Sequence, residues 1–426
     1  MRWSGAATLA LAATGLAVSC GGVPAPAGTH DAHHDGHHAG HQAAGAAGPP
    51  RRAGEVRGPA AGSSAFPTTT FAADGRLWAA WVEGGQVWAS SSADRGTSWA
   101  AAVAVSPAGE EIDANGEARP KIAVGPGGEA YVSYTRKGTR PYTGEVRFAR
   151  SLDGGAGFSA PLTVNAPPDD SGHRFDTLAV GSDGTVTMVW IDKRDRDLET
   201  AAGRPYVGAA LYAAVSTDRG ATFSTNRRLL EHACECCRIA AADLGDGRVA
   251  LLWRHVFGAK TRDHALVVLA RDGAPGPVRR ATFDGWELDG CPHHGPSLAA
   301  GPDGTLHLAW FTGAGADGRG IFYGRSGDGG GTFTIPTRLP AAAAAGHPAV
   351  LATNRGVWVA WVEPAAAGST VRAIRSRDGG QSFGPPVEVA TSAGAADHPS
   401  LLADRGRTVL SWFTDREGLV LVDLEE

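Results

Sequence analysis

The sequence contains little methionine and cysteine, two and five residues among 426, and it has no excess of basic charge. Its 39 Lys and Arg residues are outnumbered by 44 Asp and Glu, which gives a formal net charge of −5. Proteins that bind nucleic acid neutralise phosphates with clustered basic side chains, so this balance argues against such a partner. No apolar run beyond the first 20 residues is long enough to cross a bilayer as a helix. We therefore expect the remainder of the chain to be soluble.

The N-terminus reads MRWSGAATLALAATGLAVSC, in which one arginine precedes an apolar run that ends in small residues. This pattern is typical of a secretory signal and is too short for a stable membrane helix. The last four residues, Ala17 to Cys20, resemble a bacterial lipobox, which implies cleavage before Cys20 and a lipid on its sulfur. An ordinary cleaved signal is the alternative. We expect residues 1–19 to be a signal peptide and the protein to reach the cell envelope, lipid-anchored at the outer membrane if the host has two membranes.

Residues 20–61 begin with Cys20 and continue with Gly, Ala and Pro, with almost no large apolar side chain. Such a segment cannot offset the entropy lost on ordering, so we expect a disordered tether. Six of the 15 histidines lie within it, in GTHDAHHDGHHAGHQ. Imidazoles at this density bind nickel, copper or zinc in any conformation. A hydrophilic tether whose histidines only titrate is the alternative.

Residues 62–426 repeat a pair of short apolar strands joined by a glycine-containing turn, which is typical of a β-hairpin. Seven such pairs occur at intervals of about 50 to 60 residues, a repeat that indicates a solenoid or propeller. We predict an all-β propeller of four-stranded antiparallel blades, with seven blades and with six as the alternative. The second strand of each pair carries one aromatic residue: Trp81, Tyr134, Trp190, Trp253, Trp310, Trp361 and Trp412.

A second repeat, Ser-x-Asp-x-Gly-x-x-aromatic, follows five of the seven hairpins. It resembles the Asp-box, or BNR repeat, of sialidase-like β-propellers, in which it lies away from the ligand face. Asp and Ser side chains bond turn backbone and Gly supplies a positive φ, so we assign these segments a structural role. The seventh hairpin has no such segment, and we expect residues near 54–59 to supply its outer strand and close the ring. The five aspartates are Asp94, Asp153, Asp218, Asp328 and Asp378.

Three of the five cysteines lie in HACECCRIAAAD, just before the first strand of the fourth repeat. The corresponding place in the fifth repeat reads ELDGCPHHGPSLAAG. Three pairs of residues in these loops share one spacing of 57, the same as that between Trp253 and Trp310. Because neighbouring blades place such loops side by side, the six residues are predicted to form one cluster. The pairs are Cys234 with Cys291, Cys236 with His293, and Cys237 with His294.

Mixed thiolate and imidazole ligands suit copper(I) or zinc. Our main hypothesis is therefore a protein that binds or handles a soft transition metal at this cluster, with copper first and zinc second as the cofactor. Two disulfides are an alternative, since four cysteines remain after Cys20 in an oxidising compartment. In that case the protein is an interaction scaffold for another envelope protein. One disulfide combined with a His/Cys metal site is a second alternative, and a redox dithiol is a third.

Further polar residues lie at the starts of the repeats and in nearby loops, on the face that binds ligands in propellers. Exo-sialidases of the superfamily that the repeats resemble use three arginines for the sugar carboxylate, a Tyr–Glu nucleophile pair and an Asp acid/base. The planar guanidinium suits a carboxylate because it binds through two parallel hydrogen bonds. The resemblance implies a glycan as the alternative ligand and glycoside hydrolysis as the alternative function, although the FRIP motif is replaced by ARPKIA and no catalytic residue is assignable. The candidate residues on this face are Arg119, Arg174, Arg238, His173, His347, His398, Tyr142 and Tyr206.

Overall fold

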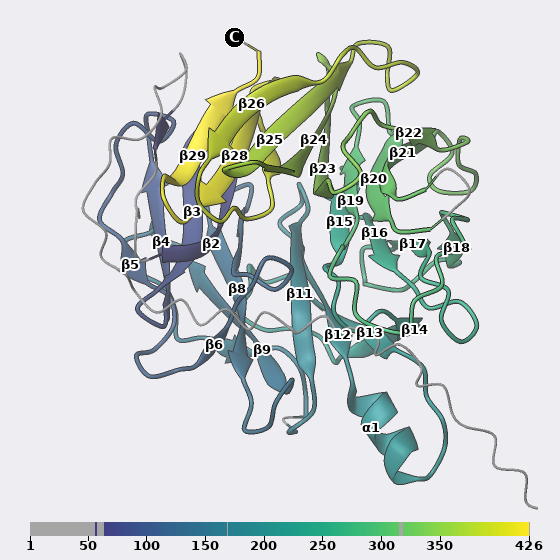
Figure 1. Cartoon of the computed structure of the whole chain (residues 1–426). Helices are drawn as coiled ribbons and strands as arrows, with labels where there is room; N and C mark the ends of the chain where they lie inside the picture. The colour runs from purple at the N-terminus through teal and green to yellow at the C-terminus, as the bar shows by residue number, and fades with distance from the viewer. Residues whose placement is uncertain (1–55, 58–63, 168, 315–317, 426) are drawn as a thin grey trace, which may run out of the picture. The chain divides into compact units, whose positions relative to one another are not determined.

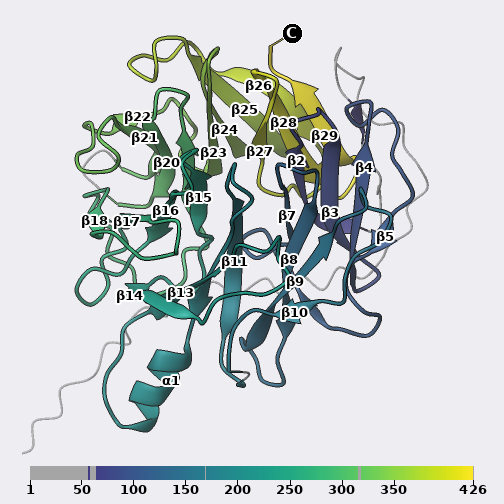
Figure 2. The same ribbon diagram turned by 180° about the vertical axis from the view of Figure 1, so that it is seen from behind.

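The structure is a computed structural model that describes residues 56–57, 64–167, 169–314 and 318–425. The predicted signal peptide, the lipidation site Cys20 and the histidine-rich tract lie outside the described residues. The described residues group into one unit, and their strands form seven antiparallel sheets (Figures 1 and 2). Each sheet corresponds to one sequence repeat, so the prediction of a seven-bladed β-propeller is confirmed.

We number the blades by their innermost strands in chain order. In the first three blades, the chain runs outward from the innermost strand to the outermost strand. Blade 2 has an additional short strand, β6, beside β8. Blade 1 contains β2 (Ser64–Phe71), β3 (Leu77–Glu83), β4 (Gln86–Ser92) and β5 (Val103–Ala104); blade 2 contains β6 (Ile112–Asp113), β7 (Lys121–Val124), β8 (Ala130–Lys137), β9 (Gly144–Ser151) and β10 (Leu162–Thr163); blade 3 contains β11 (His173–Val180), β12 (Val186–Asp192), β13 (Ala209–Ser216) and β14 (Arg227–Ala233).

The remaining four blades follow the same order, except that the outermost strand of blade 7 comes from the N-terminal side. Blade 4 contains β15 (Ala240–Asp243), β16 (Val249–Arg254), β17 (His264–Leu269) and β18 (Arg279–Arg280); blade 5 contains β19 (Ser297–Ala300), β20 (Leu306–Thr312), β21 (Gly320–Ser326) and β22 (Thr337–Arg338); blade 6 contains β23 (Gly346–Thr353), β24 (Gly356–Ala365), β25 (Gly368–Ser376) and β26 (Val387–Ser392); blade 7 contains β27 (Ser400–Asp404), β28 (Arg407–Thr414), β29 (Gly418–Asp423) and β1 (Val56–Arg57).

The ring is closed by strand β1, which pairs antiparallel with β29. Val56 lies opposite Leu421, and Arg57 lies opposite Val420. The predicted closure by residues near 54–59 is therefore confirmed. Pairing of this kind leaves β29 without an open edge, which would otherwise be available for strand addition by another chain.

The aromatic residue of each second strand is buried and has its polar edge satisfied, as a buried indole requires. In three blades the partner is the acidic residue two positions along the strand. Trp190 Nε1 donates to Asp192 at 2.8 Å, and the indoles of Trp81 and Trp361 donate in the same way to Glu83 and Glu363. These acidic residues at the ends of second strands therefore anchor core tryptophans.

The five Ser-x-Asp-x-Gly segments form the turns between the third and fourth strands. In the first, Ser92 Oγ donates to Asp94 at 2.8 Å and accepts from the Gly96 N–H at 2.6 Å. Asp94 also accepts from the Ser98 N–H at 2.8 Å, and hydrogen bonds to Ser98 and Ser92 lower its pKa to about 2. In an antiparallel blade these turns lie at the opposite end from the loops that join second and third strands.

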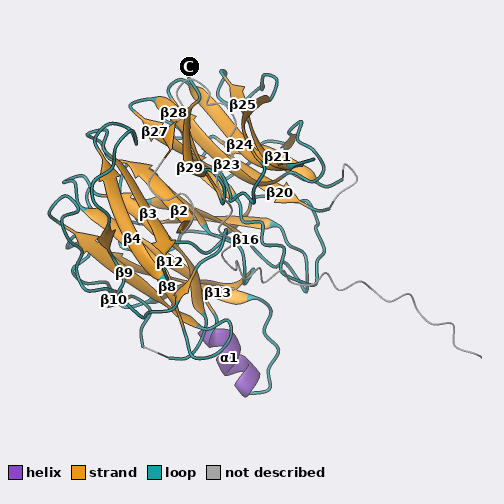
Figure 3. Cartoon of the chain, turned by 60° about the vertical axis from the view of Figure 1, so that its left-hand side comes forward, coloured by secondary structure: helices purple, strands orange, loops and turns teal. Residues whose placement is uncertain are grey.

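The one helix in the described part of the chain, α1 (Arg194–Ala201), lies in the loop between β12 and β13 of blade 3 (Figure 3). It projects beyond the strands at the end of the blade where the loops between second and third strands lie (Figures 1 and 3). It is eight residues long, and no helix among the described residues is long and apolar enough to span a membrane.

We predict that the pairing of β1 with β29 stabilises the whole ring. A chain that lacks residues 1–57 should have a free energy of unfolding lower by about 1–3 kcal/mol than a chain that lacks residues 1–47, because β29 loses its ladder hydrogen bonds. The exposed edge of β29 should also promote self-association. Urea unfolding and light scattering after gel filtration measure the two effects. Equal stability and equal mass per particle for both chains would contradict the closure.

Candidate active site

The innermost strands of the blades surround a central channel, and a cavity of about 440 Å³ lies within it. Residues of β2, β7, β15, β19, β23 and β27 line its wall, together with residues just before β7, β15 and β27. The charged and imidazole side chains among the lining residues are Glu117, Arg119, Lys121, Arg238, Asp243 and His398. Four of these six come from the segments that enter blades 2, 4 and 7, where the chain turns toward the axis.

Glu117 is the most heavily bonded of these residues. Its Oε2 accepts from the backbone N–H of Arg238 at 2.7 Å and from that of Gly295 at 2.9 Å. Its Oε1 accepts from Arg238 Nη1 at 2.9 Å. The carboxylate is 3% exposed, and burial alone would favour its protonated form. The Arg238 charge, the His347 side chain and the backbone hydrogen bond outweigh burial and hold the pKa of Glu117 well below its usual value.

A second buried ion pair joins blades 2 and 7. Arg119 Nη2 lies 2.6 Å from Asp397 Oδ1 and also donates to the Gly116 carbonyl at 2.6 Å. The other oxygen of Asp397 is buried without a hydrogen-bond partner. Burial raises the pKa of Asp397 although Arg119 opposes the change. The two carboxyl groups near the axis therefore have pKa values shifted in opposite directions.

Three histidines from consecutive blades stack in a row beside Glu117. The ring centroids of His347 and His398 are 3.4 Å apart, and those of His294 and His347 are 4.4 Å apart. The far side of His294 packs on Phe311 at 4.2 Å. Burial lowers the pKa of all three imidazoles, that of His294 to about 2, so the row is uncharged at neutral pH.

The hydrogen bond from Arg238 fixes the tautomer of His398. Arg238 Nη1 lies 3.2 Å from His398 Nδ1, and a guanidinium can only donate, so Nδ1 is the acceptor. The proton of the neutral ring is then on Nε2. Glu117, His347 and His398 also have ligand atoms within 4.8 Å of one another, as in a metal site. Because the Arg238 guanidinium donates to both Glu117 and His398, it already supplies the positive charge that a metal ion would bring there.

Lys121 is the first residue of β7 and lines the cavity. Its Nζ donates to the Arg119 carbonyl at 2.6 Å. Burial lowers the pKa of Lys121 to about 8, and the charges of Arg119 and Arg238 act in the same direction against Asp176 and Glu117. A lysine with this pKa is partly deprotonated at neutral pH and can accept a proton.

The cations of this group face the cavity more than the acids do. The side chain of Arg238 is 19% exposed and that of Arg119 is 12% exposed, whereas Glu117 and Asp397 are both below 5%. A ligand that enters the channel therefore meets the guanidinium groups of Arg238 and Arg119 before the two carboxylates. This arrangement favours an anionic ligand, because its charge is attracted to groups that remain partly solvated.

The other arginine and the two tyrosines predicted for this face are not among the residues that line the cavity. Arg174 forms an ion pair with Asp113 at 2.5 Å, and its guanidinium lies 5.9 Å from the ring of Tyr142, which is 69% exposed. The hydroxyl of Tyr206 is buried without a hydrogen-bond partner, and its ring packs near His232. The structure therefore brings together Arg119 and Arg238 but does not add Arg174 to a three-arginine clamp.

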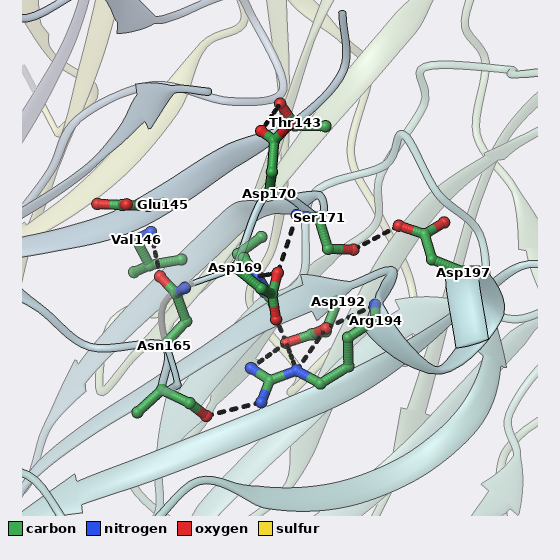
Figure 4. A network of polar contacts seen from close by, with 12 residues as sticks. Thr143, Glu145, Val146, Asn165, Asp169, Asp170, Ser171, Asp192, Arg194 and Asp197 are labelled. Atoms are coloured by element: carbon green, nitrogen blue, oxygen red, sulfur yellow. Dashed lines mark hydrogen bonds and ion pairs between the residues drawn. The ribbon is translucent and has the colours of Figure 1, made fainter. Parts of the chain in front are cut away.

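His173 is completely buried in a polar network of blade 3. Its Nδ1 lies 2.9 Å from Asp192 Oδ2 and its Nε2 lies 2.8 Å from Asp169 Oδ1. Figure 4 shows Arg194 bonded to Asp192 in the same network, with Nη2 at 2.7 Å from Oδ2. Burial opposes protonation, but hydrogen bonds to Asp192 and Asp169 raise the pKa of His173. These contacts tie the start of β11 to the loop that carries α1, so His173 has a structural position.

The cysteines are brought together across blades 4 and 5. Cys234 Sγ lies 3.6 Å from Cys237 Sγ and 3.8 Å from Cys236 Sγ. Ligand atoms of Cys236, Cys291 and His293 lie within 4.8 Å of one another. All four sulfurs are free thiols. His294 does not join this cluster, because its ring stacks on Phe311 and His347 at the channel.

Sequence reasoning did not single out Glu117, Lys121 or Asp397. Two of them lie in the segment GEARPK, which leads into the first residue of β7, and Asp397 directly precedes His398. The shared signal is a charged or imidazole residue followed by proline at the start of a blade, as in Arg119-Pro120 and His398-Pro399. Glu117 and Asp397 lie close to such positions in the sequence and could have been named as candidate site residues. Only the three-dimensional contacts show which cations they bind.

No protein-family model and no curated protein sequence matches the chain. Solved structures share its fold. An ulvan lyase of polysaccharide lyase family PL25 has a TM-score of 0.59 at 12% identity, covering 86% of this chain and 95% of that one. The polysaccharide lyase Uly1 has a TM-score of 0.55 at 10% identity, covering 84% and 89%. The Hadza microbial sialidase Hz136 has a TM-score of 0.49 at 15% identity, covering 85% of this chain and 66% of the sialidase. The fold is thus similar to β-propellers named as glycan-processing enzymes.

Our sequence-based hypothesis that the protein functions by binding or handling copper at the cysteine cluster is wrong. The structures that share the fold are named for glycan chemistry, which favours the alternative reading. The contacts agree in part with this correction, because His294, one of the six predicted ligands, belongs to the channel instead of the cluster. A copper or zinc cofactor stays a prediction.

We predict a pH dependence of stability that the His294→Phe variant removes in part. The folded pKa of His294 is about 2 and the unfolded value is 6.5, so stability is fully present above pH 6.5 and falls as the unfolded chain protonates. Between pH 7 and pH 5, the free energy of unfolding of the variant should fall by about 2 kcal/mol less than that of the wild type. Urea unfolding at the two pH values measures this difference.

His173→Asn provides a control of opposite sign. The folded pKa of His173 is raised, so its contribution is present at low pH and is lost as pH rises. In His173→Asn, the fall in the free energy of unfolding between pH 7 and pH 5 should therefore be larger than in the wild type. An unchanged pH dependence in His294→Phe would contradict the burial of a neutral imidazole at this position.

Proposed function

We propose that the protein is a glycan-processing enzyme that binds a carboxylate-bearing polysaccharide at the channel mouth and cleaves it by elimination. One observation carries this proposal: Arg119, Arg238, Lys121 and His398 line a single cavity, with their acidic partners buried behind them. Similar structures with TM-scores above 0.5 include an ulvan lyase of family PL25 and Uly1, both named polysaccharide lyases, and one ulvan lyase structure is described as bound to -[GlcA(1-4)Rha3S]-. Glucuronate carries a carboxylate, the group that guanidinium side chains bind best.

In the proposed reaction, the cations at the cavity wall bind the uronate carboxylate. Neutralisation of this charge acidifies the hydrogen on the adjacent carbon. The neutral amine of Lys121 takes that hydrogen as a proton. The electron pair of the broken carbon–hydrogen bond forms a carbon–carbon double bond, and the bond from the sugar carbon to the glycosidic oxygen breaks. The departing oxygen takes a proton from water. The Nε2–H of His398 is available to donate a hydrogen bond to the carboxylate.

Hydrolysis fits the site less well. A glycosidase needs two carboxyl groups that reach the glycosidic bond, one as acid and one as base or nucleophile. Glu117 accepts hydrogen bonds from Arg238 and Gly295, and Asp397 is held by Arg119. Both side chains are almost completely buried. The elimination route instead uses the cations that face the cavity.

The predicted location of the protein at the cell envelope is part of the same proposal and is consistent with this function. A lipid on Cys20 and a tether through residue 61 would hold the propeller at the cell envelope, where it meets external polysaccharides. The five Ser-x-Asp-x-Gly turns support membership of the Asp-box propellers, since their hydrogen bonds repeat the expected pattern.

We predict that Lys121→Met lowers kcat at least about 100-fold on a uronate polysaccharide, the usual effect of removing a general base. In the wild type, kcat/KM should rise with pH up to about 8, because the amine must be deprotonated to accept the proton. The ultraviolet absorbance of the unsaturated product measures the reaction, and a reducing-end assay counts the bonds cleaved.

Lys260→Met is the matched control, since Lys260 forms an exposed ion pair with Glu287 away from the cavity. It should leave kcat unchanged. The carboxyl-reduced form of the same polymer should not be cleaved by the wild type. New reducing ends without unsaturated product would indicate hydrolysis instead of elimination. Absence of cleavage of any uronate polymer would overturn the proposed function.

A further inference from the structure

The cysteine cluster lies beside the proposed site and shares its loops. Cys237 directly precedes Arg238, whose N–H and guanidinium both bind Glu117. Cys291 lies three residues before His294, whose ring stacks in the histidine row. The two loops that bring the sulfurs together are therefore the loops that position Arg238 and His294.

The sulfurs differ sharply in their access to solvent. Cys234 and Cys237 are buried, and Cys236 is 5% exposed, whereas Cys291 is exposed. Cys291 is thus the sulfur that a dissolved reagent meets first. Cys236 is its neighbour across the blade boundary, with the two sulfurs and a ring nitrogen of His293 within 4.8 Å of one another.

We infer that Cys236 and Cys291 form a redox-active pair, a dithiol that closes to a disulfide between blades 4 and 5. A disulfide requires sulfurs about 2 Å apart, so one loop must move toward the other. The loop of Cys291 can do so, because within the described chain residues 289–293 make no backbone–backbone hydrogen bond. Pairing of the adjacent Cys236 and Cys237 would instead require a strained ring.

The oxidant is a small-molecule disulfide of the glutathione class. The thiolate of Cys291 attacks one sulfur of this disulfide, which forms a mixed disulfide and releases one thiolate. Cys236 then loses its proton to water and attacks the sulfur of Cys291, which releases the second thiolate. Two protein thiols are oxidised and one external disulfide is reduced to two thiols, so the electrons balance.

Closure would join the loop of Arg238 covalently to the loop of His294. It encloses a long segment of chain, which restricts the unfolded state more than a short loop would. The inference goes beyond the proposed function, and its direct readout is a covalent bond that needs no activity. Failure of the glycan assay and failure of this pair are therefore separate results.

The test treats the full chain with oxidised glutathione, blocks remaining thiols with N-ethylmaleimide and maps the cysteines by peptide mass spectrometry. A chelator is present throughout, so that trace metal does not mask thiols. We expect a Cys236–Cys291 link with Cys234 and Cys237 blocked as thiols. Reduction should lower the melting temperature by roughly 5 °C.

Three single variants separate this pairing from the others. Cys236→Ser should accumulate a glutathione mixed disulfide at Cys291 that does not resolve, and Cys291→Ser should form neither product. Cys234→Ser is the matched control from the same loop and should form the link as the wild type does. A link from Cys291 to Cys234 or Cys237, or four cysteines that remain blocked as thiols, would overturn the inference.

Discussion

The arrangement of the channel depends on one buried ion pair, that between Glu117 and Arg238. Glu117 enters from blade 2 and Arg238 from blade 4, and the carboxylate also accepts the N–H of Gly295 at blade 5. Arg238 extends the contact to blade 6 through the Pro348 carbonyl at 3.0 Å and to blade 7 through His398. A single pair of charges therefore joins five of the seven blades at the axis. Removal of one partner from such a pair typically costs about 3–5 kcal/mol, because the other charge stays buried.

This pair also contributes to the protonation states around it. Burial is the main cause of the lowered imidazole pKa values, and the Arg238 guanidinium adds to it by opposing a positive charge on His347 and His398, so the histidine row stays neutral. The same guanidinium, together with Arg119, helps to lower the pKa of Lys121 to about 8. A cluster of cations near a closed axis would be unstable without acids behind it. Glu117 and Asp397 supply that compensation while leaving the cationic groups toward the cavity.

Much of the fold could be predicted from the sequence, because each blade repeats the same local chemistry. The aromatic residues from Trp81 to Trp412 recur at similar spacing, and their burial explains why the spacing must be kept. The equal interval of 57 residues predicts that the loops of Cys234 and Cys291 lie side by side, and the structure agrees. Register alone identified neighbouring loops, but it did not show which way each side chain points.

The direction of the side chains is what the sequence could not provide. His293 and His294 are adjacent, yet His293 lies with the sulfurs and His294 stacks at the channel. Likewise, Arg238 was predicted to face a sugar carboxylate, and nothing near it in the sequence indicates that an acid 121 residues away in the chain also binds it. A partner this distant leaves no local pattern. It becomes visible only when the ring closes and brings the entrances of blades 2 and 4 to the same axis.

In each of the two loops, adjacent residues lie at different places: one lies with the cysteine cluster and the next lies at the channel. In blade 4 the division falls between Cys237, which packs with buried apolar residues, and Arg238, which reaches the axis. In blade 5 it falls between His293 and His294. Because a protein interior transmits small displacements through close packing, a shift of Cys237 or His293 is expected to displace its neighbour at the channel. The sulfur cluster and the channel are therefore one peptide bond apart in blade 4, whereas three residues separate Cys291 from His294 in blade 5.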